Sequence, residues 1–541
     1  MGGFLPRPAL AMTADAASQR KIQEPGGAKL RYRHAMRSRR QPTAHHKDSA
    51  MIRIAFDHSY ARDLPGAYEP ALPDAPPAPA LLYWNAPLAA ELGLDAADAS
   101  AAELAAAFSG AALPAGAQAI AQAYAGHQFG GLSPSLGDGR AMLLGEVIDH
   151  NGQRRDIALK GSGRTAFSRR GDGKAAVGPM LRELIIGEAM QALGIPTTRA
   201  LAVAATGETV HRERPLPGAV LTRVAASHLR VGTFQYFAIR GETDMLRKLA
   251  DYAIARHYPE LAGRDDRYLA LLAAAAERQA ALIARWMHAG FIHGVMNTDN
   301  MALSGETIDY GPCAFMDAHH PDTVFSSIDR NGRYAYGNQP AIAQWNLARF
   351  AETLLPLISP ADPGGAVPAA TEIIEGFANR YQSIWLEQAR RKLGLPDAQN
   401  GDLALIEDWL TLLAAQGVDH TLAWRYLADA AEGQRAPLAA LFPAPQELEP
   451  WLLQWLTRLA IKTRRASDVA AAMRKQNPLY IPRNHLVEEA LDAASERGDM
   501  EPALRLLEVL RDPFTEREGL MRYALPAAPE VAEGYRTFCG T

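Results

Sequence analysis

The feature that most constrains this chain is a β-hairpin signal that ends in a lysine and leads into a helix. Two apolar runs, 141–148 and 155–160, flank the turn segment 149–153, which contains an Asn-Gly pair. Asn-Gly between two such runs is the strongest short-range hairpin signal, because both residues tolerate the positive φ of a tight turn. A helix is predicted over 179–193, since a proline suits its first turn and a glycine follows its end. The sequence therefore predicts a β-rich region that contains one helix.

After the strands the sequence turns helical. Helices are predicted over 243–257 and 267–289, and a non-helical island over 291–316 interrupts the helical part. Beyond this island almost all of the chain has helical patterning. The predicted fold class is therefore α+β, with a β-rich N-terminal lobe over 51–235 and an extended, mostly helical C-terminal lobe over 236–541.

Residues 1–50 differ in charge from the rest of the chain. They hold ten Lys and Arg against three acidic residues, a net charge of +7, whereas the remaining 46 basic and 57 acidic residues give −11. The segment lacks the apolar stretch of a secretory signal, and its Arg-rich composition resembles a transit peptide. The Glu-Pro-Gly-Gly run at 24–27 favours instead a disordered or wrongly assigned extension upstream of Met51. We expect a cytoplasmic protein, or a mitochondrial one if the extension is a transit peptide.

Composition excludes several classes of protein. The 541 residues are 48% hydrophobic and 21% charged, as in ordinary globular proteins, and no run of 18 apolar residues indicates a membrane span. Only Cys313 and Cys539 occur, which excludes a disulfide scaffold and a Cys-rich zinc site. The acidic body argues against a large nucleic-acid surface. We therefore expect a reducing compartment, no membrane and no nucleic-acid partner.

Lys160 closes the second strand of the predicted hairpin, and Glu183 lies on the helix that follows. This helix is apolar on most sides, and a buried carboxylate without a cation is strongly destabilising, so Lys160 is a suitable partner for Glu183. Protein kinases use a strand lysine in the same way, paired with a helix glutamate and with nucleotide phosphates. The alternative is that the two residues are separate surface charges.

The island supplies hard oxygen ligands. It opens with His-Gly-Val-Met-Asn-Thr-Asp-Asn at 293–300, and Asp309 follows nine residues later. Mg²⁺ is usually held by one or two side-chain oxygens together with phosphate oxygens and water, and Asn300 and Asp309, predicted on facing strands, match the Asn and Asp of kinases. Val295 stands where enzymes similar to aminoglycoside kinases carry their catalytic aspartate, and valine cannot accept a proton. Asp299 is the candidate replacement.

More cations surround the predicted pocket than one triphosphate requires. They are Arg164, Arg169, Arg170, Lys174, Arg223 and Arg230. Each arginine alone is most simply a surface charge, whereas together they fit a pocket that clamps a polyphosphate in an unusual orientation. The turn Gly137-Asp138-Gly139 precedes the hairpin, where glycine lets backbone N–H groups approach an anion.

Several sequence segments of this chain resemble the selenoprotein O (SelO) family of pseudokinases. The resemblance covers nearly all of the chain except the basic segment 1–50. It rests on residues 126–130, 137–140, 159–165, 293–300, 308–312 and 477–484. It implies a protein-kinase-like bilobal fold and a protein adenylyltransferase that uses ATP as its co-substrate. In such an enzyme ATP binds flipped relative to kinases, and AMP passes to a Ser, Thr or Tyr hydroxyl of a protein with release of pyrophosphate. UMP is the alternative group transferred.

The resemblance also implies roles for individual nucleotide-site residues. Lys160 and Arg223 would contact the inverted phosphates, and Glu183 would orient Lys160. The remaining nucleotide-binding residues implied are Gly137, Gly139, Arg140, Asp172, Gly173, Arg230 and Asp309.

The metal, the base and a redox residue follow from the same resemblance. Asn300 and Asp309 would bind Mg²⁺ or Mn²⁺, and Asp299 would be the catalytic base. Cys539 resembles the C-terminal selenocysteine or cysteine that has a redox role in the family, but Val324-Phe325-Ser326 stands where some members carry a second cysteine. Two alternatives stay open: a phosphotransferase acting on a small molecule or a protein, and a non-catalytic nucleotide-binding scaffold.

Overall fold

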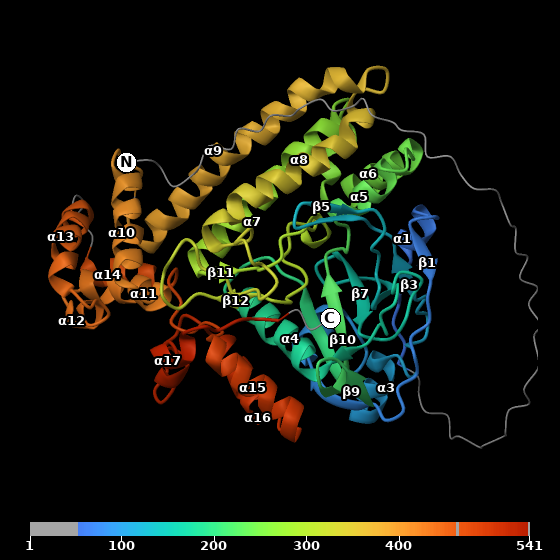
Figure 1. Ribbon diagram of the computed structural model, residues 1–541, viewed down its shortest axis with the longest axis horizontal. Helices are drawn as coiled ribbons and strands as arrows, with labels where there is room; N and C mark the ends of the chain where they lie inside the picture. The colour runs from blue at the N-terminus through green and yellow to red at the C-terminus, as the bar shows by residue number, and fades with distance from the viewer. Residues whose placement is uncertain (1–51, 396, 461–464, 539–541) are drawn as a thin grey trace, which may run out of the picture. The chain divides into compact units, whose positions relative to one another are not determined.

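The hairpin that the Asn-Gly turn predicts forms the centre of the main sheet. In the computed structural model, which describes residues 52–538 except 396 and 461–464, β6 (Ala141–Ile148) pairs antiparallel with β7 (Arg154–Lys160) (Figure 1). Ala141 lies opposite Lys160 at the end of the pair. The predicted hairpin is therefore confirmed, with one more residue at its second strand.

The main sheet has eight strands. Seven follow one another in the order β1-β3-β6-β7-β10-β9-β2, and β8 pairs with β10. Every neighbouring pair is antiparallel. The bounds of the other strands are β1 (Tyr68–Pro70), β2 (Ala80–Trp84), β3 (Ile120–Gln122), β8 (Ala175–Ala176), β9 (Arg199–His211) and β10 (Pro215–Ala225).

Side chains from alternate positions of these strands enter two different cores. Leu143, Ala158 and Leu221 pack in a core that includes α4 (Val177–Ala192), whereas their neighbours Leu159 and Val220 pack in another. The second core includes residues of α2 (Ala86–Glu91) and α3 (Ala101–Ser109). Since alternate strand residues point to opposite faces, even-numbered residues of β7 and odd-numbered residues of β10 face α4.

The chain after β10 is mostly helical, as predicted, and α6 and α7 have the predicted bounds. The helices, with α1 of the N-terminal part, are α1 (Ser59–Asp63), α5 (Val231–Ala238), α6 (Thr243–His257), α7 (Arg267–Ala289), α8 (Gln339–Ile358), α9 (Val367–Lys392), α10 (Asp402–Gln416), α11 (His420–Ala431), α12 (Ala436–Ala439), α13 (Leu448–Leu459), α14 (Ala466–Arg474), α15 (Asn484–Arg497), α16 (Glu501–Leu510) and α17 (Pro529–Ala532). Short 3₁₀ helices are η1 (Pro259–Leu261), η2 (Thr298–Asn300), η3 (Tyr336–Asn338), η4 (Pro363–Ala366), η5 (Pro445–Glu447) and η6 (Met521–Tyr523).

Figure 1 shows that most helices of the C-terminal part lie to one side of the sheet. The long helices α7, α8 and α9 lie side by side, and α15 and α16 lie beside α4. The α+β prediction is thus confirmed at the level of an antiparallel sheet followed by a helical C-terminal part. Within the described residues, no helix combines the length and the apolar character that crossing a bilayer requires.

The island between α7 and α8 is a loop closed by a very short strand pair. β11 (Phe291–Ile292) pairs with β12 (Ala314–Phe315), and η2 lies in the loop between them. The prediction that Asn300 and Asp309 lie on facing strands is wrong, because only two residues on each side are paired. Asn300 ends η2, and Asp309 lies in irregular backbone with a φ of 62°.

The motif at 477–484 builds the junction of the C-terminal helices. Arg483, directly before α15, is fully buried, and its Nη1 donates to Asp317 Oδ1 and Asp419 Oδ2, at 2.6 Å each. Its Nη2 also donates to the carbonyl of Ala524, at 2.6 Å. Asp419 in turn caps α11 by accepting from the backbone N–H of Leu422. One guanidinium therefore joins α11, α15 and the segment after β12.

We predict that Arg483→Ala lowers the free energy of unfolding by about 3–5 kcal/mol, because it leaves two largely buried carboxylates without their cation. Denaturant titration followed by circular dichroism measures this change. The control is Arg505→Ala, since Arg505 pairs with Glu508 at the surface and such exposed pairs contribute roughly 0–1 kcal/mol. Equal effects of the two substitutions would contradict the structural role of Arg483.

Candidate active site

The centre of the site is a buried ion cluster formed by two strands and a helix. Lys160 at the end of β7 and Arg223 on β10 both occupy positions that face α4. Lys160 Nζ lies 2.6 Å from Glu183 Oε2 on α4, and Arg223 Nη1 lies 3.3 Å from Glu183 Oε1. All three side chains are buried. The alternation of the two strands therefore brings both cations to one helix carboxylate.

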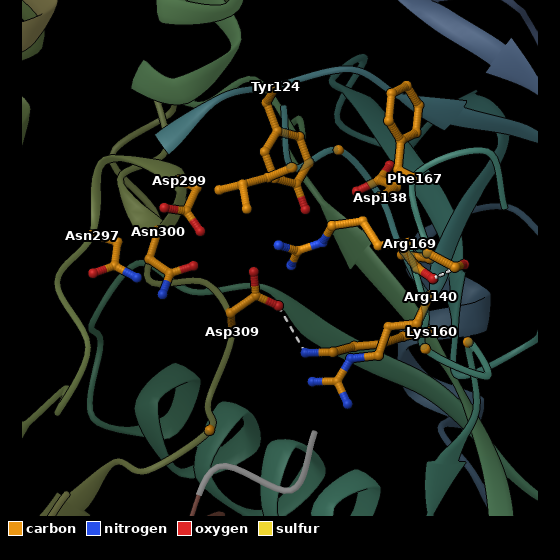
Figure 2. Close-up of a pocket in the computed structure, with 18 of the residues that line it drawn as sticks. Tyr124, Asp138, Arg140, Lys160, Phe167, Arg169, Asn297, Asp299, Asn300 and Asp309 are labelled. Atoms are coloured by element: carbon orange, nitrogen blue, oxygen red, sulfur yellow. Dashed lines mark hydrogen bonds and ion pairs between the residues drawn. The ribbon is translucent and has the colours of Figure 1, made fainter. Parts of the chain in front are cut away.

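Asp309 joins this cluster from the island loop, and Figure 2 shows it in contact with Lys160. Its Oδ1 accepts from Lys160 Nζ at 2.7 Å and from Arg223 Nη1 at 2.6 Å, and its Oδ2 accepts from Arg230 Nη1 at 2.8 Å. Burial on its own would raise the pKa of Asp309, but attraction from the three cations outweighs it and holds the pKa well below its usual range. Two carboxylates thus face three cations.

A second set of buried residues holds Arg223 in place. Arg223 Nε donates to His228 Nε2 at 3.2 Å, and His228 Nδ1 donates to Asp156 Oδ2 at 2.9 Å. Burial lowers the pKa of His228, so the neutral ring accepts from Arg223 and donates to Asp156. Arg256 donates to the other oxygen of Asp156. Sequence reasoning missed these residues; the signal available was Asp156, a charge among the apolar residues that precede Lys160.

Asp299 lies at the side of the same cavity. Its side chain is buried; Oδ2 accepts from Gln128 Nε2 at 3.3 Å, and Oδ1 has no hydrogen-bond partner among the described residues. A Cβ added to Gly126 would lie 2.2 Å from that Oδ1, so only glycine leaves room for this carboxylate. Burial raises the pKa of Asp299 to about 6, although Arg230 opposes this shift. Sequence reasoning did not identify Gln128 as its partner.

A cavity of about 360 Å³ connects these residues. Every residue to which the SelO resemblance gave a nucleotide, metal or base role lines it: Gly137, Gly139, Arg140, Lys160, Asp172, Gly173, Arg223, Arg230, Asp299, Asn300 and Asp309. Figure 2 shows Asp299 and Asn300 on one side of this space and Arg140, Arg169 and Lys160 on the other. The cavity therefore has an oxygen-bearing wall opposite a cationic wall.

The cationic insert before α4 contributes in part. Arg169 and Lys174 line the cavity, whereas Arg164 and Arg170 do not. Arg212, in the turn between β9 and β10, lines the cavity too. No sequence pattern predicted this residue.

Arg212 also explains the position of Asp172. Its Nη1 and Nη2 donate to the Asp172 carboxylate at 2.8 and 3.0 Å, and these hydrogen bonds lower the pKa of Asp172. Asp172 thus holds a cation at the cavity wall.

Two of the predicted glycines are required by close packing. Gly137 has a φ of 67°, and a Cβ there would lie 2.2 Å from the ring of Phe167. Gly173 has a φ of 71°, and a Cβ there would lie 2.1 Å from the carbonyl oxygen of Gly163. Positive φ and these close approaches both exclude a side chain. The glycine turn and the cationic insert consequently fit against one another at the cavity wall.

Asn300 and Asp309 are the two side chains predicted to bind a metal ion. Asn300 Nδ2 donates to the carbonyl of Val295 at 2.9 Å, which fixes the orientation of the amide. In the described residues, no group of three or more His, Cys, Asp or Glu side chains could hold a metal ion. Mg²⁺ ordinarily takes only one or two protein oxygens and completes its shell with phosphate oxygens and water. One amide and one carboxylate at a cationic cavity therefore fit a metal that arrives with a polyphosphate.

Of the two cysteines, Cys313 lies among the described residues. Cys539 lies outside the described residues, so its predicted redox role stays a prediction. Cys313 is fully buried, and burial raises the pKa of its thiol to about 12, which keeps it protonated. The last described residues reach the island loop, where Thr537 Oγ1 donates to the carbonyl of Pro312 at 2.8 Å.

Glu306 connects the strand that carries Arg223 to the loop that carries Asp309. Its Oε2 accepts from the backbone N–H of Ala226 at 2.9 Å and from Ser304 Oγ at 3.0 Å. Burial raises the pKa of Glu306 to about 7, although these hydrogen bonds oppose the shift. The folded protein therefore favours the protonated carboxyl group at a higher pH than water does.

Known proteins resemble this chain over most of its length. The family model described as "Protein adenylyltransferase SelO" matches residues 51–511. Similar proteins named "Protein nucleotidyltransferase YdiU" include one from Chromobacterium violaceum, 80% identical over 478 residues that span 88% of this chain and 100% of that protein. Another from Cereibacter sphaeroides is 60% identical over 489 residues, which span 90% of this chain and 99% of that protein. A third from Rhizobium leguminosarum is 56% identical over 498 residues, which span 92% of this chain and 99% of that protein.

We predict that Glu306→Gln stabilises the fold at alkaline pH. The folded-state pKa of about 7 exceeds the unfolded value of about 4.3, so the stability that the protonated carboxyl provides is complete below about pH 4 and is lost as the pH rises through 7. The variant should therefore gain up to roughly 3 kcal/mol at pH 9 and nothing at pH 4. Urea titrations across pH 4–9 measure it, with the exposed Glu508→Gln as control. A gain that does not depend on pH would refute the prediction.

Proposed function

Since the chain belongs to the SelO family of protein adenylyltransferases and is a protein nucleotidyltransferase, we propose that its cavity transfers AMP from ATP to a protein hydroxyl. The single observation that carries the proposal is the convergence of Lys160, Arg223 and Arg230 on Asp309 at a cavity whose other wall holds Asp299. Pyrophosphate would be the second product.

We propose a protein-kinase-like arrangement for the fold as well. Its support is the order of parts around the cavity: a sheet lysine paired with the glutamate of one helix, then a loop with an Asn and an Asp between the long helices α7 and α8. Kinases combine the same parts to hold a nucleotide and its metals.

The charge of the cavity suits a polyphosphate. The three cations of the cluster exceed its two carboxylates by one. Arg140 and Arg169 also line the cavity, as do Lys174, paired with Glu208, and Arg212, paired with Asp172, whereas Asp138 adds one further carboxylate to the lining. Pyrophosphate departure develops negative charge on the leaving oxygens, and cations already held in position stabilise that charge without reorganisation. The cationic wall therefore supports binding of the β- and γ-phosphates as a leaving group.

The proton acceptors of the cavity favour attack at the α-phosphorus. Val295 lines the cavity and offers no base where a phosphotransferase would need one. Asp299 lines the cavity; Gln128 donates to its Oδ2, and its buried Oδ1 has no hydrogen-bond partner among the described residues. The acceptor hydroxyl would give its proton to Asp299, its oxygen would bond to the α-phosphorus, and the bond to the bridging oxygen would break with its electron pair leaving on pyrophosphate.

We propose that Asn300 and Asp309 hold a divalent cation, Mg²⁺ or Mn²⁺, together with the phosphates. Such a cation would neutralise charge on the phosphate oxygens. The side chains themselves are prepared for this role: the Asn300 amide is oriented by the Val295 carbonyl, and Asp309 is kept ionised by its cations.

The position of the transferred label tests which phosphorus is attacked. Incubation with ATP labelled at the α-phosphate should label protein covalently, whereas ATP labelled at the γ-phosphate should leave the protein unlabelled and release labelled pyrophosphate. Autoradiography of denaturing gels and thin-layer chromatography measure both products. Protein labelled from the γ position alone would overturn the proposal and favour a phosphotransferase, and no label from either would favour a nucleotide-binding scaffold.

Variants of the cluster test the roles of its members. Lys160→Met and Asp309→Ala should each lower transfer at least about 10²-fold, the usual effect of removing one electrostatic contact to the reacting group. The Lys160→Met fold should persist, because Arg223 still contacts Glu183 and Asp309. The matched control is Arg164→Ala, an exposed cation of the same insert that does not line the cavity.

Transfer rates and melting temperatures together decide the outcome. Full transfer by Asp309→Ala would contradict the proposed metal and phosphate site. A collapsed melting temperature in Lys160→Met would assign this lysine to a purely structural ion pair.

A further inference from the structure

A small hairpin lies directly over the segment that carries Asp299. β4 (Gly126–Gln128) and β5 (Gly131–Ser133) form a two-stranded sheet of their own. Three consecutive hairpin residues bond to that segment: the backbone N–H of His127 to Thr298 Oγ1 (2.7 Å), the Gln128 amide to Asp299 Oδ2 (3.3 Å) and the backbone N–H of Phe129 to Asn297 Oδ1 (3.3 Å). The hairpin is therefore fixed in register against the proposed base.

The tip of this hairpin exposes large apolar side chains. Phe129 is 40% exposed and Leu132 on β5 is 44% exposed. Phe129 also has a φ of 52°, a region that non-glycine residues seldom occupy, and its ring contacts Tyr334 at a centroid distance of 5.1 Å. Strained backbone that the surroundings hold in place is typical of functional sites. The structure thus maintains an exposed phenylalanine beside the cavity.

A cation borders the same tip. The guanidinium of Arg333 lies against Gly130, between β4 and β5, and over the rings of Tyr334 and Trp345, 5.8 and 4.9 Å from their centroids. Its Nε is buried without a hydrogen-bond partner among the described residues. Arg349 covers the Trp345 ring as well, 5.0 Å from its centroid. Arg349 is paired with Glu352 at 2.7 Å, so the positive border of this apolar surface comes mainly from Arg333.

We infer that Phe129, Leu132 and Arg333, here called the hairpin patch, dock an extended segment of the protein that accepts AMP. The segment would carry the acceptor hydroxyl toward Asp299, an apolar side chain against Phe129 and Leu132, and an acidic side chain toward Arg333. This inference rests on the proposed function and adds the chemistry of its acceptor.

Three features of the patch favour this occupant over others. Its position beside the base places a bound segment where the hydroxyl must enter. An exposed strand such as β5 is a common template for an extended peptide, whose alternate side chains then meet the surface. The arginine border favours an acidic flank by charge complementarity.

The test is labelling of position-scanning peptide libraries with ATP labelled at the α-phosphate. Each peptide carries one central Ser, Thr or Tyr, and the flanking positions vary singly. Wild type should label peptides with an acidic residue at one flanking position and an apolar residue at another about fivefold better than peptides with lysine there. Arg333→Glu should reverse the charge preference, and Leu132→Asp should abolish the apolar preference and raise KM about tenfold with little change in kcat.

The controls separate this inference from the proposed function. Leu453→Asp changes an apolar residue that is 67% exposed on α13 and should leave the peptide profile unchanged. Wild type that labels itself and releases pyrophosphate, yet labels no peptide or shows a flat profile, overturns the inference and leaves the proposed function intact. Wild type that transfers AMP to nothing overturns both.

Sedimentation velocity tests whether a second copy of this chain occupies the hairpin patch instead. A dimer of the wild type that Leu132→Asp dissociates would assign the hairpin patch to a second copy of this chain and overturn the inference. A sedimentation coefficient shared by both proteins supports it.

Discussion

The buried ion cluster is the interaction on which the rest of the site depends. Glu183 and Asp309 are charges in a low-dielectric setting, and burying either of them alone would be strongly destabilising. Lys160, Arg223 and Arg230 compensate them, so β7, β10, α4 and the island loop must all meet at one point. This electrostatic requirement therefore adds to core packing in holding these four elements, and the segment before α5 that carries Arg230, at one point.

In the proposed reaction, the cations of this cluster bind phosphate oxygens as well as Asp309. Lys160, Arg223 and Arg230 all contact Asp309, and they face a cavity lined by further cations. In our account, phosphate oxygens share these cations, while His228 and Glu183 hold Arg223 and Lys160 in place from behind. The site is then preorganised before the nucleotide arrives, which is the condition for electrostatic stabilisation of a leaving group. Asp299 lies on the opposite wall, where Arg230 donates to its backbone carbonyl at 2.8 Å and burial raises the pKa of its carboxyl group to about 6.

Local sequence signals predicted the parts of the fold that local chemistry determines. The Asn-Gly turn predicted the β6–β7 hairpin, and glycine and proline signals predicted α4 closely. The facing strands proposed for Asn300 and Asp309 were wrong, because spacing along a loop does not specify which residues pair. His228, Arg212 and Gln128 were missed for a related reason: their partners are brought close by strand register and by contacts between distant segments. Resemblance to the SelO family, rather than periodicity, gave site roles to eleven of the residues that line the cavity.

The central claim is that the cationic cluster holds the pyrophosphate end of ATP while AMP moves to a hydroxyl. Intact mass spectrometry of the purified protein after incubation with ATP and Mg²⁺ tests it most directly. The account predicts that wild type gains the mass of one or more AMP units and that Asp309→Ala under the same conditions gains none. A gain of phosphate units, or equal gains of AMP by both proteins, would contradict it.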